Sequence, residues 1–203
     1  NMDGSTLYST ACVYGGVTDN LDDCGNGNSA MNAGAGTAAG ASFDIGNGFT
    51  AALGYTGNGA TGLMTANGTD VFGGQLAYSA DSYGASVTYS NSDGDVSYWG
   101  LNGYWTPAET GTAVPSLSVG YEFGNPTSGD DTKQWFVGLQ WDEMGAGTLG
   151  AAIGSVGTSE ENKMYEAFYS YSINDSVTIT PIVYIEEAAT DDTGVILKTS
   201  FSF

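Results

Sequence analysis

The side chains able to carry out chemistry in this sequence are carboxylates and two cysteines, because the chain contains no histidine. The Ser-His-Asp and Cys-His arrangements for nucleophilic catalysis are therefore absent. Adjacent carboxylates occur at Glu160 and Glu161, at Glu186 and Glu187, and at Asp191 and Asp192. These pairs lie in predicted loops, where they are typical of a solvated acidic surface. We therefore predict no enzyme activity, no catalytic residue and no cofactor.

Cys12 and Cys24 lie in a region rich in Gly, Asn and Asp. Reduced thiols in an exposed polar loop would be reactive, so we favour a disulfide within this loop, formed in an oxidising compartment. The alternative is two unpaired thiols. Two cysteines without a histidine cannot complete a tetrahedral zinc site, and the run NSDGD at 91–95 lacks the distal Glu of a calcium loop. We predict no metal site.

Composition limits the class of protein. The 203 residues contain 23 acidic residues against three lysines, a formal charge of −20, so binding to nucleic acid is excluded for want of basic clusters. Abundant aromatic residues and glycine predict a chain that folds as sheet. The chain has no run of about 18 apolar residues, so it predicts no transmembrane helix. This does not argue against a membrane, because each strand of a membrane barrel needs only about 10 alternating residues. Because the first residue is Asn1, we expect a processed form or a fragment.

Alternation with a period of two recurs from residue 37 onward and predicts a series of β-strands. Asn-Gly at 47–48 is a strong hairpin signal between the first two. Residues 17–36 predict a long loop, and residues 5–16 predict either a strand or part of that loop. The sequence thus predicts eleven strands, or twelve with 5–16. The predicted segments are 37–45, 49–56, 71–80, 83–90, 96–105, 115–123, 133–142, 148–155, 163–173 and two more between 177 and 203.

One face of each predicted strand is aromatic and aliphatic, and the other carries mainly Gly, Ser, Thr, Gln and Asn. In a transmembrane barrel the apolar face meets lipid, whereas in a soluble barrel it packs inside. A sheet face in water normally carries more Lys and Glu than the polar face here. We therefore predict an all-β fold, a transmembrane antiparallel up-and-down β-barrel. The alternative is a soluble or surface-anchored acidic β-barrel or sandwich that binds a ligand or partner.

Connections between the predicted strands alternate between short turns and longer acidic loops. Outer-membrane barrels have short periplasmic turns and longer external loops, which places Phe203 on the periplasmic side of a bacterial outer membrane. Fourteen of the 23 acidic residues then fall in the external set. They are Asp19, Asp22, Asp23, Asp70, Asp93, Asp95, Asp130, Asp131, Glu160, Glu161, Glu186, Glu187, Asp191 and Asp192.

Alternation also selects side chains that would line the lumen of such a barrel. Hydroxyls, amides and a few carboxylates there, with acidic external loops, predict passive conduction with a preference for cations. Residues 12–36 are the candidate for a loop that folds inward and narrows the channel, tied by Cys12 and Cys24. The predicted lumen-facing residues are Tyr98, Asn102, Glu122, Gln134, Gln140, Glu166, Thr178, Thr180, Tyr184 and Lys198.

Several runs resemble a known family. YEAFYSYSINDSVTITPIVYI, with TGVILKTSFSF, resembles the closing strands of cyanobacterial outer-membrane porins of the Som type, also described as iron-uptake porins and related to the OprB carbohydrate-selective family. KQWFVGLQWDEMGAGTLGAAIGS, NGFTAALGYTGNGATGL and YWGLNGYWTPAETG are similar to earlier hairpins of that family.

The resemblance implies a porin that passes small hydrophilic solutes and ions, with carbohydrate or iron uptake among the family's roles. It also implies a homotrimer in outer-membrane lipid. The chain would be the C-terminal part of a barrel of 14 or 16 strands, preceded by further strands and an S-layer-homology domain. The terminal aromatic residues Phe201 and Phe203 resemble the signal read by the barrel-assembly machinery.

Overall fold

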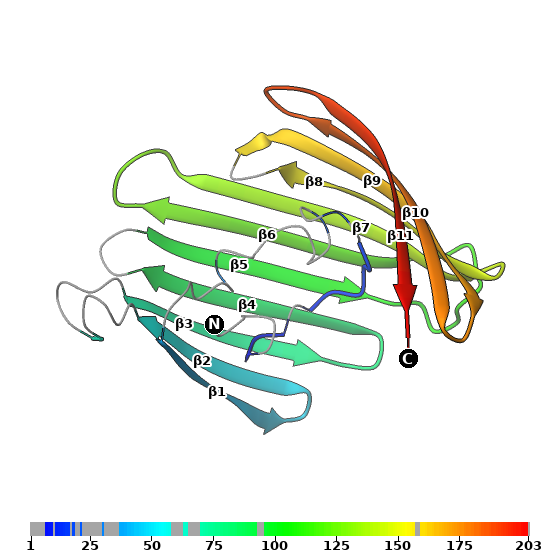
Figure 1. Ribbon diagram of the computed structural model, residues 1–203. Coiled ribbons are helices and arrows are strands. Elements are labelled where there is room, and N and C mark those ends of the chain that lie inside the picture. The colour runs from blue at the N-terminus through cyan, green and yellow to red at the C-terminus, as the bar shows by residue number, and fades with distance from the viewer. Residues whose placement is uncertain are drawn as a thin grey trace.

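The computed structural model describes residues 7–9, 11–16, 18, 21, 30, 37–57, 63–64, 70–92, 96–156 and 159–202. They form one antiparallel sheet of eleven strands in which each strand pairs with the next along the chain (Figure 1). This architecture confirms the predicted all-β up-and-down fold. The strands are β1 (Thr37–Gly46), β2 (Phe49–Gly57), β3 (Asp70–Ser79), β4 (Tyr83–Ser92), β5 (Val96–Trp105), β6 (Ser116–Pro126), β7 (Thr132–Met144), β8 (Gly147–Val156), β9 (Ser159–Asn174), β10 (Val177–Glu187) and β11 (Asp192–Phe201).

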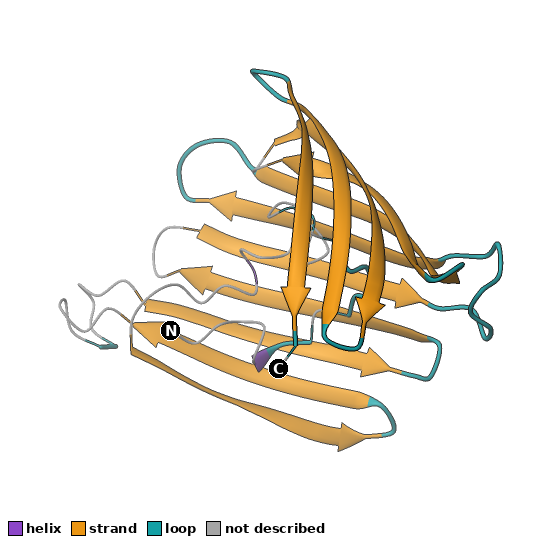
Figure 2. Ribbon diagram, turned by 45° about the vertical axis from the view of Figure 1, so that its right-hand side comes forward, coloured by secondary structure: helices purple, strands orange, loops and turns teal. Residues whose placement is uncertain are grey.

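The sheet curves into an open trough, with β1 and β11 at the two ends of the strand order (Figures 1 and 2). Such curvature follows from the twist of adjacent strands. The predicted Asn-Gly turn joins β1 to β2. There Asn47 and Gly48 both have positive φ, 54° and 83°, which is the backbone geometry that Asn and Gly adopt most readily.

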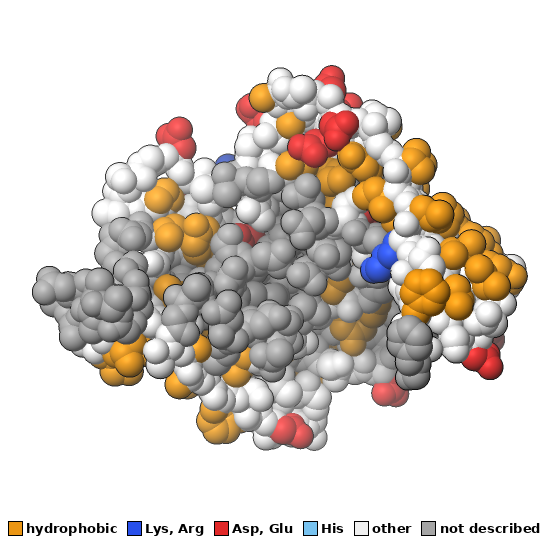
Figure 3. All heavy atoms as spheres, viewed as in Figure 1, with side chains coloured by type: hydrophobic (Ala, Val, Ile, Leu, Met, Phe, Trp, Pro, Cys, Tyr) orange, Lys and Arg blue, Asp and Glu red, His pale blue; other side chains and the backbone are white. Residues whose placement is uncertain are grey.

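Large apolar side chains cover the convex side of the sheet. Val195 is 76% exposed, Leu197 66% and Leu53 65%. On the concave side most residues are small or polar, such as Ser86, Thr88 and Ser90 of β4, and a few are large and apolar, such as Phe136 of β7 and Phe168 of β9. Figure 3 shows hydrophobic side chains gathered over the flank on the right of the view, with acidic side chains mostly toward the strand ends. This sidedness is opposite to that of a soluble barrel, whose apolar face packs inside, and it matches a barrel wall in lipid.

Within the described residues no helix is long and apolar enough to cross a bilayer.

Several predicted loop residues belong to strands. Glu160 and Glu161 lie at the start of β9, and Glu186 and Glu187 end β10, so the prediction that these carboxylate pairs lie in loops is wrong. The strands extend beyond the apolar alternation because backbone pairing continues where side chains become charged. Asp70 begins β3 and is only 2% exposed; it accepts a hydrogen bond from the Tyr55 hydroxyl at 2.8 Å rather than standing in solvent.

Residues 5–16 were predicted as a strand or as part of a loop. Their described residues, 7–9 and 11–16, contain no strand. Their backbone N–H groups bond to side chains of the sheet instead of to a neighbouring strand, as described below.

The inner wall and the segment that crosses it

A segment before β1 lies inside the trough, across the concave face (Figures 1 and 2). We call its described residues, 7–9, 11–16, 18, 21 and 30, the inner segment. Tyr8, Tyr14 and Leu21 are among the most buried side chains of the molecule, at 4%, 4% and 0% exposure. The apolar side chains of the inner segment pack with the few large apolar side chains of the concave face, and together they form the apolar core on that side.

Neutral polar side chains of the wall hold the backbone of the inner segment at three points. Gln75 on β3 accepts from the Ser9 N–H at 2.6 Å and donates to the Ser9 carbonyl at 2.9 Å. Ser118 Oγ on β6 accepts from the N–H groups of Val13 and Tyr14, both at 3.1 Å. Gln140 on β7 accepts from the Gly15 N–H at 2.9 Å. The segment thus crosses the wall from β3 to β7, fixed by side chains that point into the trough.

Two carboxylates add charge-assisted contacts. Glu166 on β9 accepts from the Tyr14 hydroxyl and from the Thr18 N–H, each at 2.8 Å. Glu122 on β6 accepts from the Ala30 N–H at 2.7 Å. Both are nearly removed from solvent, at 3% and 1% exposure. Their charges are therefore engaged in holding the inner segment and do not face the open lumen.

Burial and the negative charge of Glu166 both act on Tyr14. Desolvation is the larger cause, followed by the charge of Glu166 and by the hydrogen bond to it, and together they raise the pKa of the Tyr14 hydroxyl above its usual value. Burial alone raises the pKa of Tyr8. Both phenols therefore remain neutral at physiological pH, and Tyr14 keeps its role as a donor.

Glycines in the wall provide the space for the large side chains of the inner segment. A Cβ on Gly73 would lie 2.6 Å from the Tyr8 hydroxyl oxygen, and one on Gly138 would lie 2.7 Å from Cγ of Tyr14. Leu21 occupies the corresponding space at Gly154, where a Cβ would lie 2.8 Å from Cδ2 of Leu21. Any larger residue at these three positions would displace the segment.

The ring of Tyr14 is held between two aromatic rings of the wall. Its centroid lies 5.4 Å from that of Phe136 on β7 and 5.6 Å from that of Phe168 on β9, both in tilted geometry. Such pairs stabilise by about 0.5–1.5 kcal/mol beyond the burial of area. Leu21, Met164 and Ile182 complete this cluster. The inner segment therefore has an apolar anchor beside its polar ones.

The ten predicted lumen-facing residues share the concave face of the sheet. Asn102, Glu122, Glu166 and Thr180 are buried, and Lys198 is exposed. The remaining five are half-buried: Tyr98, Gln134, Gln140, Thr178 and Tyr184. Register agrees with this placement, since Glu122 pairs with Gln134 and Thr180 pairs with Lys198.

Sequence reasoning missed the wall residues that hold the inner segment through neutral contacts, Gln75 and Ser118. A long amide such as Gln75, on a face of small residues, is a signal that could have singled it out. The predicted carboxylates Glu122 and Glu166 were assigned to the lumen, but their hydrogen bonds to the segment could not be read from alternation.

Cys12 is disulfide-bonded, and Cys24, its expected partner, lies outside the described residues. Phe201 is 60% exposed near the end of β11, whereas Phe203 lies outside the described residues. Among the residues that the structure describes, no group of three or more His, Cys, Asp or Glu is arranged to hold a metal ion.

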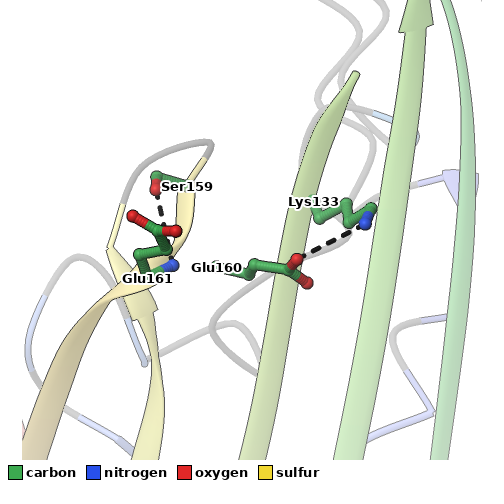
Figure 4. Close-up of polar contacts among 4 residues, drawn as sticks. All are labelled: Lys133, Ser159, Glu160 and Glu161. Atoms are coloured by element: carbon green, nitrogen blue, oxygen red, sulfur yellow. Dashed lines mark hydrogen bonds and ion pairs between the residues drawn. The ribbon is translucent and has the colours of Figure 1, made fainter. Parts of the chain in front are cut away.

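At the rim where β7 and β9 begin, Lys133 forms an ion pair with Glu160 (Figure 4). The Nζ–Oε1 distance is 3.3 Å, and both side chains are about half exposed. Beside it the Glu161 N–H donates to Ser159 Oγ at 3.4 Å. An exposed pair of this kind contributes about 0–1 kcal/mol, so it orders the rim only weakly.

A curved antiparallel sheet with an apolar convex face, a mainly polar concave face and a chain segment fixed inside it has the architecture of a membrane β-barrel wall. The profile of the Gram-negative porin family matches residues 1–193. The chain belongs to this family, whose members are channels rather than enzymes, and this confirms the prediction of a non-enzyme.

Solved porin structures share the fold. Two mutants of the Rhodopseudomonas blastica porin superpose with TM-scores of 0.63 and 0.61, at 16% and 18% identity, over 82% of this chain and 55% of theirs. An anion-selective porin from Comamonas acidovorans gives 0.57 at 16% identity, over 91% of this chain and 58% of that one. The chain thus spans little more than half the length of these porins. No curated protein matches it.

Proposed function

We propose that the chain forms part of the wall of a bacterial outer-membrane pore that admits small hydrophilic solutes and inorganic ions by passive diffusion. The observation that carries this proposal is the polar concave face with the inner segment fixed across it by Gln75, Ser118, Gln140, Glu122 and Glu166. A segment anchored inside the lumen narrows the path that solutes take. The bond at Cys12, with Cys24 as the proposed partner, closes a loop within this part of the chain and restricts the conformations that it can adopt.

We also propose that the pore prefers cations. Since Glu122 and Glu166 are buried under the inner segment, the preference must come from other acidic residues. Carboxylates gather at the end of the sheet that carries the connections β6–β7, β8–β9 and β10–β11, where they raise the local concentration of cations. The described acids at this rim are Asp130, Asp131, Glu160, Glu161, Glu186, Glu187, Asp191 and Asp192. The Comamonas porin is named anion-selective, and we expect the opposite preference here.

Planar bilayers test both parts of the proposal. The full chain, reconstituted in a salt gradient, should show channels whose reversal potential has the sign of a cation-selective pore. Raising the salt from about 0.1 M to about 1 M should weaken the preference, because the Debye length shortens from about 10 Å to about 3 Å. Absence of channels would remove the pore function, and an anion-selective reversal potential would remove only the cation preference.

A pair of variants locates the source of selectivity. Asp130→Asn with Asp131→Asn removes two charges from the acidic rim and should reduce the preference. Asp81→Asn with Asp175→Asn also removes two charges, in the exposed turns β3–β4 and β9–β10 at the opposite end of the sheet; it is the matched control and should change the preference less. Equal effects of the two changes would show that total charge, not the rim, sets the preference.

The soluble alternative is tested on a gel. A membrane barrel should require detergent and shift its mobility when boiled, whereas a soluble acidic binding protein should do neither. The exposed apolar convex face supports the membrane barrel, since contiguous apolar surface of this kind is costly in water.

The finer proposals rest on the sequence resemblance. They are a Som-type or OprB-like porin with a role in carbohydrate or iron uptake, a homotrimer, and recognition of Phe201 and Phe203 by the barrel-assembly machinery. A periplasmic C-terminus is proposed from the alternation of short turns and longer loops. We also retain a closed barrel of 14 or 16 strands: β1 and β11 run in the same direction, so antiparallel closure takes an odd number of further strands. Protease accessibility of a tag after Phe203 in intact cells tests the orientation.

A further inference from the structure

Three tyrosines of the concave face each lie directly across a strand pair from a glycine. Tyr104 on β5 pairs with Gly84 on β4, and Tyr98 on β5 pairs with Gly124 on β6. Tyr184 on β10 pairs with Gly194 on β11. Directly opposed residues are the closest neighbours on one face of a sheet, so the glycine decides what room the ring has.

The three rings lie against the backbone of these glycines. A Cβ on Gly124 would be 2.5 Å from Cε1 and 2.7 Å from Cδ1 of Tyr98, and it would also lie against Oγ1 of Thr132. At Gly84 it would be 2.5 Å from Cε1 of Tyr104, and at Gly194 it would be 2.5 Å from Cζ of Tyr184. Real Cβ atoms do not approach so closely, so each ring occupies the space that any other residue would fill with its side chain.

Hydrogen bonds of two hydroxyls run along the wall, not across the lumen. The Tyr184 hydroxyl donates to Asp192 Oδ2 on the adjacent strand β11 at 3.0 Å. The Tyr104 hydroxyl lies 3.1 Å from Ser79 Oγ at the end of β3. With the ring over a glycine and the hydroxyl bonded to the adjacent strand for Tyr184, or to the strand beyond it for Tyr104, these side chains lie along the wall and protrude little into the lumen.

We propose that Gly84, Gly124 and Gly194 keep wide the part of the pore that the inner segment leaves open, by holding Tyr104, Tyr98 and Tyr184 flat against its wall. This inference rests on the proposed pore function. Tyr98 lies near the start of β5 and Tyr184 near the end of β10, which are at the same end of the sheet. Two of the three pairs therefore border one mouth of the channel, five strands apart.

Adding one methyl group tests the proposal. In Gly124→Ala the new Cβ meets both the Thr132 hydroxyl, which can rotate away, and the Tyr98 ring, which must leave the wall and turn toward the lumen. Selectivity for size follows from pore diameter, so liposome permeation of a disaccharide should fall about twofold or more relative to that of a pentose. The matched control is Gly103→Ala on the convex face of β5, where a Cβ would meet its nearest neighbours at 3.4–4.0 Å.

A double variant identifies the ring as the cause. Gly124→Ala combined with Tyr98→Ala should restore disaccharide permeation to at least the wild-type level, because the displaced ring is gone. A mobility shift on a gel after boiling, as in wild type, first shows that each variant forms a folded barrel. If Gly124→Ala does not fold, Gly194→Ala with and without Tyr184→Ala makes the same comparison at the other pair.

The outcomes separate this inference from the pore function. If wild-type protein passes no sugar, the proposed pore function itself is wrong. If wild-type protein passes sugar and Gly124→Ala passes the disaccharide equally well, only the proposed role of the glycines is wrong. An equal fall in Gly103→Ala, or a double variant that stays low, also overturns it, because the loss would then not come from the Tyr98 ring.

Discussion

Glu166→Gln removes one negative charge from beneath the inner segment while it preserves the shape of the side chain. Glu166 is 3% exposed and accepts hydrogen bonds from the Tyr14 hydroxyl and the Thr18 N–H, both at 2.8 Å. The variant has one acceptor oxygen in place of two, so Oε1 can still accept from the Thr18 N–H while Nε2 must donate to the Tyr14 hydroxyl oxygen, and neither bond is then charge-assisted. We expect the inner segment to remain in place and to detach more often.

The magnitude follows from the two bonds. A hydrogen bond to a charged group contributes about 1.5–3 kcal/mol and a neutral one about 0.5–1.5 kcal/mol, so two bonds lose about 2 kcal/mol together. That loss corresponds to about a thirtyfold larger detached population, since 1.4 kcal/mol is a factor of ten. Local opening of this kind is measured by hydrogen exchange.

The assay is hydrogen exchange by mass spectrometry, in detergent, of the peptide that contains Tyr14 and Thr18. Exchange there should accelerate about thirtyfold in Glu166→Gln, in line with the change in opening free energy, while peptides of β4 and β5 exchange as in wild type. Glu161→Gln, an exposed change at the start of the same strand, is the control. If the two variants exchange alike, the carboxylate of Glu166 does not hold the segment and the reasoning fails.

Three further predictions concern the same face. Tyr14→Phe keeps the packing on Phe136 and Phe168 and should weaken the segment by about 1–2 kcal/mol, whereas Tyr14→Ala should cost about 3–5 kcal/mol; equal exchange rates in the two variants would contradict a role for the rings. Because the folded-state pKa of Tyr14 is raised, its contribution to stability should be complete below about pH 10 and decline as pH rises further. The difference in phenolate absorbance between wild type and Tyr14→Phe should therefore show this hydroxyl ionising after the exposed tyrosines, and ionisation with them would refute the burial argument. Neither amide atom of Asn102 has a hydrogen-bond partner among the described residues, although the side chain is 5% exposed. Asn102→Leu should therefore leave the urea midpoint unchanged or higher, while Gln75→Leu, which removes bonds to Ser9 and Thr88, should lower it.

Strand positions were the most predictable part of the molecule. The bounds of β5, Val96–Trp105, agree with the predicted segment, and all eleven predicted strands are present. Ends were less predictable where charge interrupts the alternation, as at Glu160 and Glu161 in β9. Side-chain alternation reports the direction of a side chain, whereas a strand continues as long as its backbone is paired.

The candidate site was predicted only in part. Alternation placed Glu122, Gln140 and Glu166 on the face that lines the trough, because their direction depends on strand parity alone. It did not show that they would bond to the inner segment. The partners Ala30 and Glu122 are 92 residues apart in sequence, and Thr18 and Glu166 are 148 apart.

The sequence by itself determined the strands, their two faces and the excess of acidic charge, since these follow from local backbone geometry and composition. Tertiary structure alone decided how the sheet curves, which charges were buried and where the inner segment lies. Those features depend on curvature and on long-range contacts, such as Tyr14 over Gly138 and Leu21 over Gly154. The sequence does not show which glycines have another side chain packed over them and which do not, because that depends on the long-range contacts.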